Sequence, residues 1–103
     1  MCARLFCAAA LIALAAAAPA AGYTVKSSVE CPDIVREDSH ENYREMNKWW
    51  LMGYFTGRNY ASDAESGKSI EDENIYQMAL DYCRSNPGDD WDDAAIHVYD
   101  RLD

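Results

Sequence analysis

The amino-acid sequence predicts an all-α fold, a small bundle of three to four helices held by one disulfide. Three observations support this fold class. Apolar residues recur at helical spacing in several segments, and no segment alternates convincingly as a strand does. Beyond residue 20 the chain keeps only two cysteines, Cys31 and Cys83. Residues 21–103 are enough for a single helical domain.

The first twenty residues, MCARLFCAAALIALAAAAPA, predict a signal peptide. Arg4 gives a positive start, Leu5 to Ala18 form an apolar stretch, and Ala18-Pro19-Ala20 provides a small-residue cleavage site. The stretch is too short and too rich in alanine for a membrane span. We therefore expect export, cleavage after residue 20, and a mature domain of residues 21–103.

Cleavage would remove Cys2 and Cys7 and leave two cysteines. In a small exported domain two cysteines are expected to form one disulfide. Closing a loop of about 50 residues between Cys31 and Cys83 is worth about 4 kcal/mol in the chain-entropy model. A disulfide is therefore expected to supply a large share of the stability of so small a core.

Two helices are predicted in the first half of the domain, after an arm at residues 21–30 that shows no periodicity. A short helix at about 32–36 would carry Pro32 in its first turn, where a missing N–H costs little. A long helix at about 39–61 would be capped by Asp38, with Glu41 as its capping-box partner. The turn-forming residues 62–68 end it.

Two further helices are predicted in the second half. One at about 70–86 would follow Ser69 as a cap, and it ends before Asn86-Pro87-Gly88 because proline cannot continue a helix. Its stripe consists of Ile75, Met78, Ala79, Tyr82 and Cys83. The last helix, at about 90–102, has a stripe of Trp91, Ala95, Val98, Tyr99 and Leu102.

The long helix contains the most unusual stretch of the chain, Trp49 to Gly57, or WWLMGYFTG. Apolar positions run through 43, 46, 50, 54, 57 and 61, and further apolar residues widen this stripe on both edges. Gly53 and Gly57 lie four residues apart, a spacing that lets another backbone approach closely. Since short helices can hardly cover every side of such a helix, part of the stretch is expected at the surface, where apolar patches mark partners. The candidate client-binding or partner-binding residues are Trp49, Trp50, Leu51, Met52, Tyr54 and Phe55.

The charge of the chain excludes two classes of partner. The full chain has a formal charge of −9, and without Arg4 residues 21–103 carry −10. A polyanion is repelled by phosphate backbones and by anionic lipid surfaces. We expect no nucleic-acid partner and no stable membrane insertion.

The sequence offers no candidate catalytic site, metal site or cofactor site, and we expect a protein that is not an enzyme. His40 and His97 stand alone. The acidic run lacks the ligand pattern of an EF-hand loop; its carboxylates instead crowd the positive end of the last helix. They are the pH-sensing candidates: Asp89, Asp90, Asp92 and Asp93.

These residues together resemble the HdeA/HdeB family of periplasmic proteins, over essentially the whole mature chain. The resemblance lies in Cys31, the Trp50-Leu51-Met52-Gly53-Tyr54 segment, Tyr82-Cys83-Arg84-Ser85-Asn86-Pro87, and a final helix at Trp91 to Leu102. It implies an HdeA-like helical fold with Cys31 bonded to Cys83, residence in the periplasm, and a possible homodimer. The best-known members are acid-stress chaperones that hold unfolding clients on exposed apolar surface without ATP.

Two functions are therefore expected. The first is an acid-activated holdase of HdeA/HdeB type, in which protonation of carboxylates loosens the helices and the candidate residues of the long helix capture clients. The second is a specific interaction protein with one periplasmic partner at neutral pH. The Gly-Tyr-x-x-Gly segment also resembles the small helical immunity proteins that neutralise secreted peptidoglycan amidases.

Overall fold

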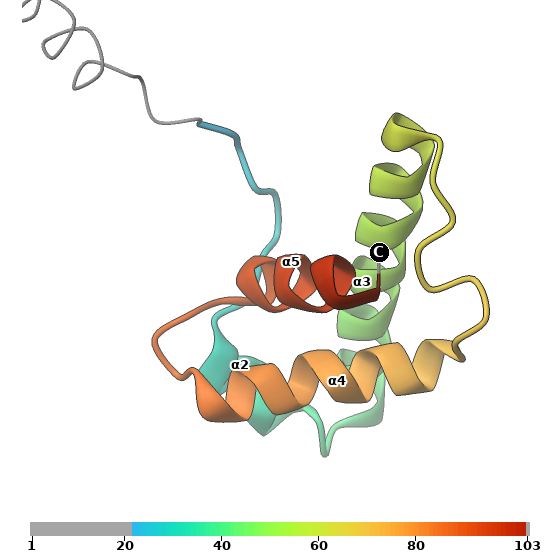
Figure 1. Ribbon diagram of the computed structural model, residues 1–103. Coiled ribbons are helices and arrows are strands. Elements are labelled where there is room, and N and C mark those ends of the chain that lie inside the picture. The colour runs from blue at the N-terminus through green and yellow to red at the C-terminus, as the bar shows by residue number, and fades with distance from the viewer. Residues whose placement is uncertain (1–21, 103) are drawn as a thin grey trace, which may run out of the picture.

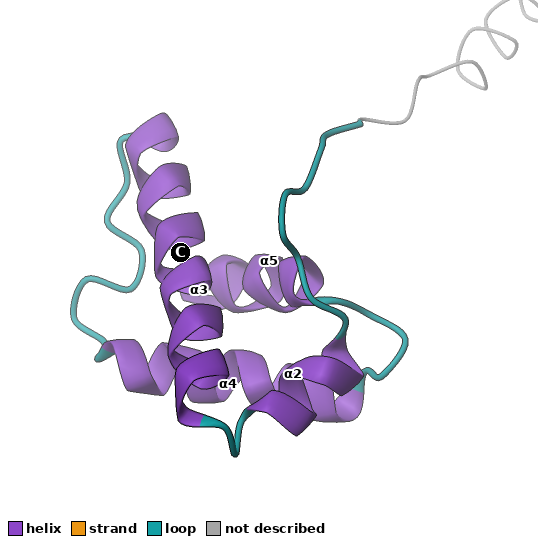
Figure 2. Cartoon of the chain, turned by 180° about the vertical axis from the view of Figure 1, so that it is seen from behind, coloured by secondary structure: helices purple, strands orange, loops and turns teal. Residues whose placement is uncertain are grey.

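The computed structural model describes residues 22–102, and within them it confirms the all-α fold. Four helices follow in order: α2 (Cys31–Glu37), α3 (Glu41–Ser62), α4 (Asp72–Ser85) and α5 (Trp91–Leu102) (Figure 1). In this range there is no strand, and one isolated bridge joins Glu30 to Asp90 (Figure 2). No helix of the described range is long and apolar enough to cross a membrane. The predicted signal peptide at 1–20 lies outside the described residues.

The helices meet around a core at the centre of the molecule. α4 packs along α5 and against α2, while α3 stands across them and projects beyond them at its C-terminal end (Figures 1 and 2). The largest fully buried side chains are Trp91, Tyr76, Ile34, Leu51, Leu80 and Val98.

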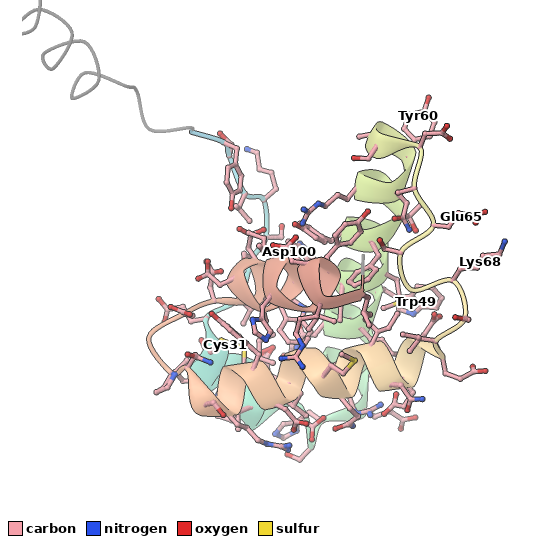
Figure 3. All side chains as sticks on the ribbon, viewed as in Figure 1. Cys31, Trp49, Tyr60, Glu65, Lys68 and Asp100 are labelled. Carbon is pink, nitrogen blue, oxygen red and sulfur yellow. A yellow bond between two sulfur atoms is a disulfide. The ribbon has the colours of Figure 1, made fainter. Side chains whose placement is uncertain are left out.

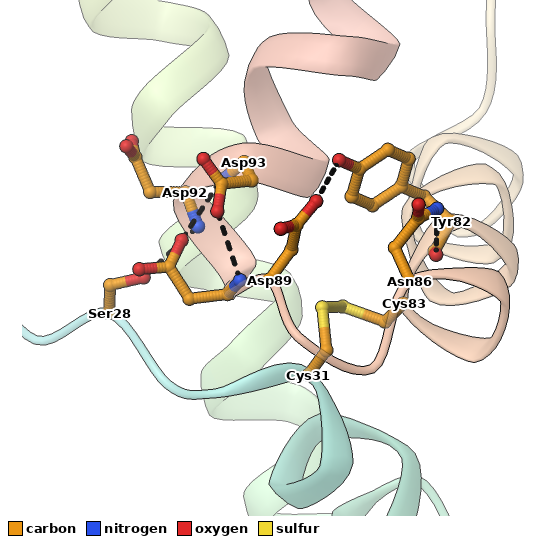
Figure 4. The surroundings of a disulfide bond; sticks show 9 residues. Ser28, Cys31, Tyr82, Cys83, Asn86, Asp89, Asp92 and Asp93 are labelled. Atoms are coloured by element: carbon orange, nitrogen blue, oxygen red, sulfur yellow. Dashed lines mark hydrogen bonds between the residues drawn. A yellow bond between two sulfur atoms is a disulfide. The ribbon is translucent and has the colours of Figure 1, made fainter.

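The predicted disulfide is present and fully buried. Cys31 at the start of α2 is bonded to Cys83 near the end of α4, across 52 positions of the sequence and a Cα–Cα distance of 4.8 Å (Figure 4). Cys31 is 0% exposed and Cys83 is 1% exposed. The bond therefore joins two helices inside the core rather than at the surface.

Two of the predicted helix caps are wrong. α3 begins after His40, with no side-chain cap, and Asp38 instead ends α2. The Asp38 carboxylate accepts hydrogen bonds from the Tyr76 hydroxyl (2.8 Å) and from Arg44 Nε (3.2 Å). α4 begins after Glu71, so Ser69 does not cap it. In both places a tertiary or loop contact replaced the local one that the sequence suggested.

The start of α5 agrees with the prediction. Asp90 and Asp93 cap it reciprocally: the Asp93 N–H donates to Asp90 Oδ1 (3.0 Å) and the Asp90 N–H donates to Asp93 Oδ2 (3.1 Å). Carboxylates at this end are also favoured by the helix dipole.

The N-terminal segment, residues 22–30, is irregular, but it is tied to the bundle rather than free. The Trp91 N–H donates to the Val29 carbonyl (2.7 Å), and the Asp92 N–H donates to Ser28 Oγ (3.0 Å). These bonds satisfy two of the N–H groups that a helix start leaves unpaired. Trp50 Nε1 donates to the Lys26 carbonyl (3.0 Å), which holds the same segment against α3.

The loop from α3 to α4 is held by one amide side chain and one glycine. Asn59 Nδ2 donates to the Ser66 carbonyl (3.0 Å), and Asn59 Oδ1 accepts from the Ser66 N–H (3.1 Å). Gly67 has φ of +80°, and a Cβ there would lie 3.0 Å from Ile75 Cδ1 and 3.3 Å from the Phe55 ring. The loop conformation thus depends on glycine at position 67.

Gly67→Ala is therefore expected to lower the free energy of unfolding by about 2 kcal/mol, through the positive φ and the crowded side chains. Gly53→Ala is the matched control: it lies inside α3, a Cβ there meets nothing within 4 Å, and replacing a helical glycine stabilises by about 0.5–1 kcal/mol. Urea unfolding followed by circular dichroism measures both. Equal effects of the two substitutions would contradict this account of the loop.

Candidate binding surface on helix α3

α3 turns a different side toward the core from the one that its apolar spacing suggested. Its buried residues are Asn47, Leu51 and Phe55. The predicted stripe through 43, 46, 50, 54, 57 and 61 lies half-buried or exposed instead. The centre of the apolar arc therefore faces outward, and only one of its edges reaches the core.

One exposed arc of α3 carries no charged residue. We define the outward face as Asn42, Tyr43, Met46, Trp49, Gly53, Thr56, Gly57, Tyr60 and Ala61, all of which are exposed. At 100° per residue these positions span an arc of about 140°. Tyr60 is 90% exposed, Trp49 66%, Met46 65% and Tyr43 54%. Figure 3 shows the side chains of Trp49 and Tyr60 along α3. The face is thus a long aromatic and uncharged strip on a molecule of net charge −9.

The charged residues of α3 occupy the opposite arc. Arg44 pairs with Asp38 and with Glu73 of α4, and Lys48 pairs with Glu45 (3.0 Å) and Glu73 (3.5 Å). The hydrogen bond from Arg44 lowers the pKa of Glu73. These ion pairs join α3 to its neighbours, so its basic residues Arg44 and Lys48 point toward the rest of the bundle.

Arg58 continues this pattern near the far end of α3. Its guanidinium pairs with Asp100 of α5 (2.8 Å) and lies over the Tyr99 ring, 4.1 Å from the centroid. Arg58 also donates to the Tyr54 hydroxyl (3.0 Å). The remaining charge of the helix, Glu41, is exposed in its first turn and lies on the same charged arc.

The six candidate binding residues do not form one surface in the folded protein. Leu51 and Phe55 belong to the core, with 0% and 5% exposure. The half-buried residues Trp50 and Tyr54 stack on each other with ring centroids 6.1 Å apart. Met52 is also half-buried, and Trp49 alone of the six is exposed.

The close packing predicted at Gly53 and Gly57 does not occur within the described chain. A Cβ at either glycine would meet nothing within 4 Å. The two glycines instead leave a section of the outward face without side chains, between Trp49 and Tyr60. Met46, Tyr43 and Tyr60 were missed as surface residues, although the clustering of all charges on the other arc of α3 was visible in the sequence.

A groove borders the outward face beside Trp49. Its volume is about 350 Å³, and it lies between α3, the loop at 66–70 and the start of α4. Its walls and floor are Trp49, Met52, Phe55, Thr56, Asn59, Ser66, Gly67, Lys68, Ile70, Asp72 and Ile75.

The four pH-sensing candidates lie together at the start of α5, where they tie other segments to it (Figure 4). Asp89 accepts a hydrogen bond from the Tyr82 hydroxyl, which raises the pKa of Tyr82 to about 12. Asp92 is buried and accepts from the Tyr23 hydroxyl (2.9 Å). Burial raises the pKa of Asp93, and the nearby charge of Asp90 raises it further. A backbone hydrogen bond has the opposite effect, smaller than that of burial.

These carboxylates have structural partners. Oxygens of Asp90, Asp92 and Asp93 lie within 4.8 Å of one another, and in the described range they are the one group with the composition of a metal-binding cluster. Each of them already accepts a hydrogen bond from a helix N–H or from a tyrosine hydroxyl. The three carboxylates thus cap the start of α5 and hold the N-terminal segment to it.

A second groove of about 510 Å³ lies between α4 and α5. His97 forms part of it, against the Tyr82 ring at a centroid distance of 4.7 Å.

Comparison of the chain with family models, with curated proteins and with solved structures found no match. The resemblance to the HdeA/HdeB family thus stays a prediction from the residues, and the surface of α3 is the feature on which a function can be argued.

Proposed function

We propose that this protein is a non-enzymatic binding protein that holds another protein on the outward face of α3. The observation that carries the proposal is the absence of charge on that face. Exposed aromatic residues and methionine with few charges are the composition of an interface core. An apolar strip of this length on a small acidic protein marks an interaction site.

The form of this function that the geometry supports best is binding to one specific partner at neutral pH, as an immunity-type or structural protein. The outward face is already exposed in the folded protein, while the inward charges are paired. The face lies on a single rigid helix, so little conformational entropy is lost on binding. No loosening of the bundle is needed to present it.

Acid-stress chaperoning of HdeA/HdeB type in the periplasm is the second candidate, and a different observation favours it. Carboxylates accept the hydrogen bonds or ion pairs that tie segments together: Tyr23 to Asp92, Tyr76 to Asp38, and Arg44 to Glu73. Protonation of Glu73 weakens its pair with Arg44, because that pair lowers the pKa of Glu73 in the folded protein. The loss of negative charge also leaves the basic residues uncompensated. Leu51 and Phe55 would then join the exposed strip.

The acid response can be assigned with one variant, Glu73→Gln. The folded pKa of Glu73 is lowered, so its stabilisation is present above the ordinary carboxyl pKa of about 4.3 and is lost as the pH falls through the folded value. We expect Glu73→Gln to be less stable than wild type at pH 7, by at most about 1 kcal/mol because the site is half exposed. The difference should vanish near pH 2.

Unfolding by urea at each pH measures this difference, and Glu65→Gln, from an exposed pair with Lys68, is the control without a pH-dependent effect. Asp93 acts in the opposite direction: its raised folded pKa means that protonation on acidification favours the folded state. A Glu73→Gln difference that stays constant from pH 7 to pH 2 would contradict the role given to this carboxylate.

The binding surface is tested with Met46→Ser/Trp49→Ser, which removes two exposed apolar side chains and should leave the fold intact. Light scattering of citrate synthase diluted from guanidinium at pH 7, which needs no reductant, and of alcohol dehydrogenase at pH 3 reports client protection. We expect the double variant to lose most of any protection, and most of its affinity for a cognate protein purified with the wild type. Asn74→Ser, at an exposed residue of α4 outside the face, is the control.

The two forms of the function give different results in this experiment. A specific binding protein protects neither client but forms a stable complex at pH 7, whereas a holdase protects at pH 3. If the double variant binds and protects as wild type does under both conditions, the outward face is not the binding surface.

A further inference from the structure

The groove beside Trp49 has an apolar floor, mixed walls and a carboxylate, Asp72, in its lining. Phe55 and Ile75 are buried at its floor, and Met52 and Ile70 are half-buried along it. Trp49 stands exposed on the α3 side, while the loop that carries Lys68 lies on the other (Figure 3). The groove thus combines an indole and aliphatic side chains with polar residues of α3, the loop and the start of α4.

The charges at this groove are not balanced. Lys68 is paired with Glu65 at 3.2 Å, and both side chains are more than 70% exposed. Asp72 also lines the groove, is exposed, and forms no ion pair among residues 22–102. Its neighbour Glu71 is likewise exposed without an ion pair in that range. The groove is therefore lined both by an exposed tryptophan and by a carboxylate that has no ion pair among residues 22–102.

We propose that this groove receives an arginine or lysine side chain of the protein partner. The methylene stem of such a side chain would lie on Met52 and Ile70, as the stems of basic residues commonly lie on apolar surface. Its charge would be placed between the Trp49 ring and the Asp72 carboxylate. A cation is attracted to the face of an indole and to a carboxylate alike. The inference rests on the proposed function and adds the chemistry of the partner.

The position of the groove at the edge of the outward face fits this assignment. The centre of the face is uncharged, and the basic contact lies at its border, where interfaces place the polar contacts that set specificity and association rate. The net charge of −9 attracts a basic partner over a longer range. The partner is thus a protein surface with an apolar centre and a basic side chain beside it.

The groove is also preformed. The Asn59 amide holds the loop at Ser66 through two hydrogen bonds, and the Tyr99 hydroxyl fixes the same amide by donating to Asn59 Oδ1 (2.7 Å). Gly67 brings the loop backbone down onto Phe55 and Ile75. A wall that is fixed before binding costs little ordering entropy.

The test uses the mature oxidised protein and an amphipathic helical peptide of leucine and arginine, with a matched peptide of leucine and glutamine. Fluorescence anisotropy of the labelled peptides gives the affinities. Two-dimensional NMR of the ¹⁵N-labelled protein locates the contact at the Trp49 indole N–H and the Gly67 amide. We expect the arginine peptide to bind at these signals and the glutamine peptide to bind at least 10-fold more weakly.

Two charge-neutralising variants separate a site from general attraction to an acidic protein. Asp72→Asn should lower the affinity for the arginine peptide at least 5-fold. Glu41→Gln should change this affinity less than 2-fold, because Glu41 is an exposed acid in the first turn of α3 without an ion pair among residues 22–102. Equal binding of the two peptides, or equal effects of the two variants, overturns the inference.

The same experiment distinguishes failure of this inference from failure of the proposed function. If Trp49→Ser weakens both peptides while Asp72→Asn has no effect, the outward face is the binding surface but the partner is not basic at this groove. If neither variant matters, both proposals fail. If sedimentation shows that the chain self-associates through Trp49 and excludes the arginine peptide, a second copy occupies the face and the inference is wrong.

Discussion

Trp91→Ala is expected to lower the free energy of unfolding by about 3–5 kcal/mol, the range for removing a large aromatic side chain from a core. Trp91 is 1% exposed, its indole N–H donates to the Asn47 carbonyl (2.9 Å), and its ring meets Tyr76 edge-on at 5.8 Å. Its backbone N–H also holds the N-terminal segment at Val29. The side chain thus lies where α5 meets both α3 and α4.

Urea unfolding followed by circular dichroism at 222 nm measures this loss without relying on tryptophan emission. Trp49→Ala is the matched control, because it removes the same side chain from an exposed site and should change stability by no more than about 0.5 kcal/mol. Trp91→Phe should fall between the two, since it keeps a ring but loses the hydrogen bond. If Trp49→Ala is as destabilising as Trp91→Ala, the assignment of the inward face of α3 is wrong.

Removing the disulfide is the second large effect. Joining residues 52 positions apart is worth about 4 kcal/mol in the chain-entropy model, and a domain of this size has a total stability of about 5–10 kcal/mol. We expect Cys31→Ala/Cys83→Ala to lower the melting temperature by roughly 15–30 °C, with part of the protein unfolded at 37 °C.

Differential scanning calorimetry of the double variant measures the effect. Wild-type protein reduced in denaturant and returned to buffer with a phosphine reductant gives an independent value, because it loses the bond while keeping both sulfur atoms unmodified. A melting temperature that agrees with that of oxidised wild type within a few degrees in both preparations would show that the helices alone hold the fold.

The helices and their order could be predicted from the sequence because their signals are local. The stripe of α4, the proline and glycine after it, and the carboxylates at the start of α5 each act within a few residues. The disulfide was predicted from the two cysteines, Cys31 and Cys83, that lie beyond the predicted leader. For these features local propensity and tertiary structure agree.

The inward side of α3 could not be predicted from apolar spacing, because its apolar arc is too wide to indicate one side. The information lay in the charged residues. Arg44, Lys48 and Arg58 lie along the bundle and pair with α4 and α5, so the uncharged arc is left to the solvent. A helix with charges on its inner flanks reverses the usual amphipathic pattern.

Two other features depended on contacts distant in sequence. Asp38 looks like a helix cap, but its carboxylate is used by Tyr76, 38 positions away. The N-terminal segment has no periodicity of its own, and its bonds reach α5 more than 60 positions later. Neither contact leaves a pattern that single-sequence reasoning can detect.

The buried Cys31–Cys83 bond has a consequence for how the protein is made. Four cysteines in the full chain permit three fully paired arrangements, whereas two permit one. Once the predicted leader is cut off, oxidation therefore has a single intramolecular product. Forming this bond requires an electron acceptor, and with two cysteines it requires no isomerase to correct mispaired thiols.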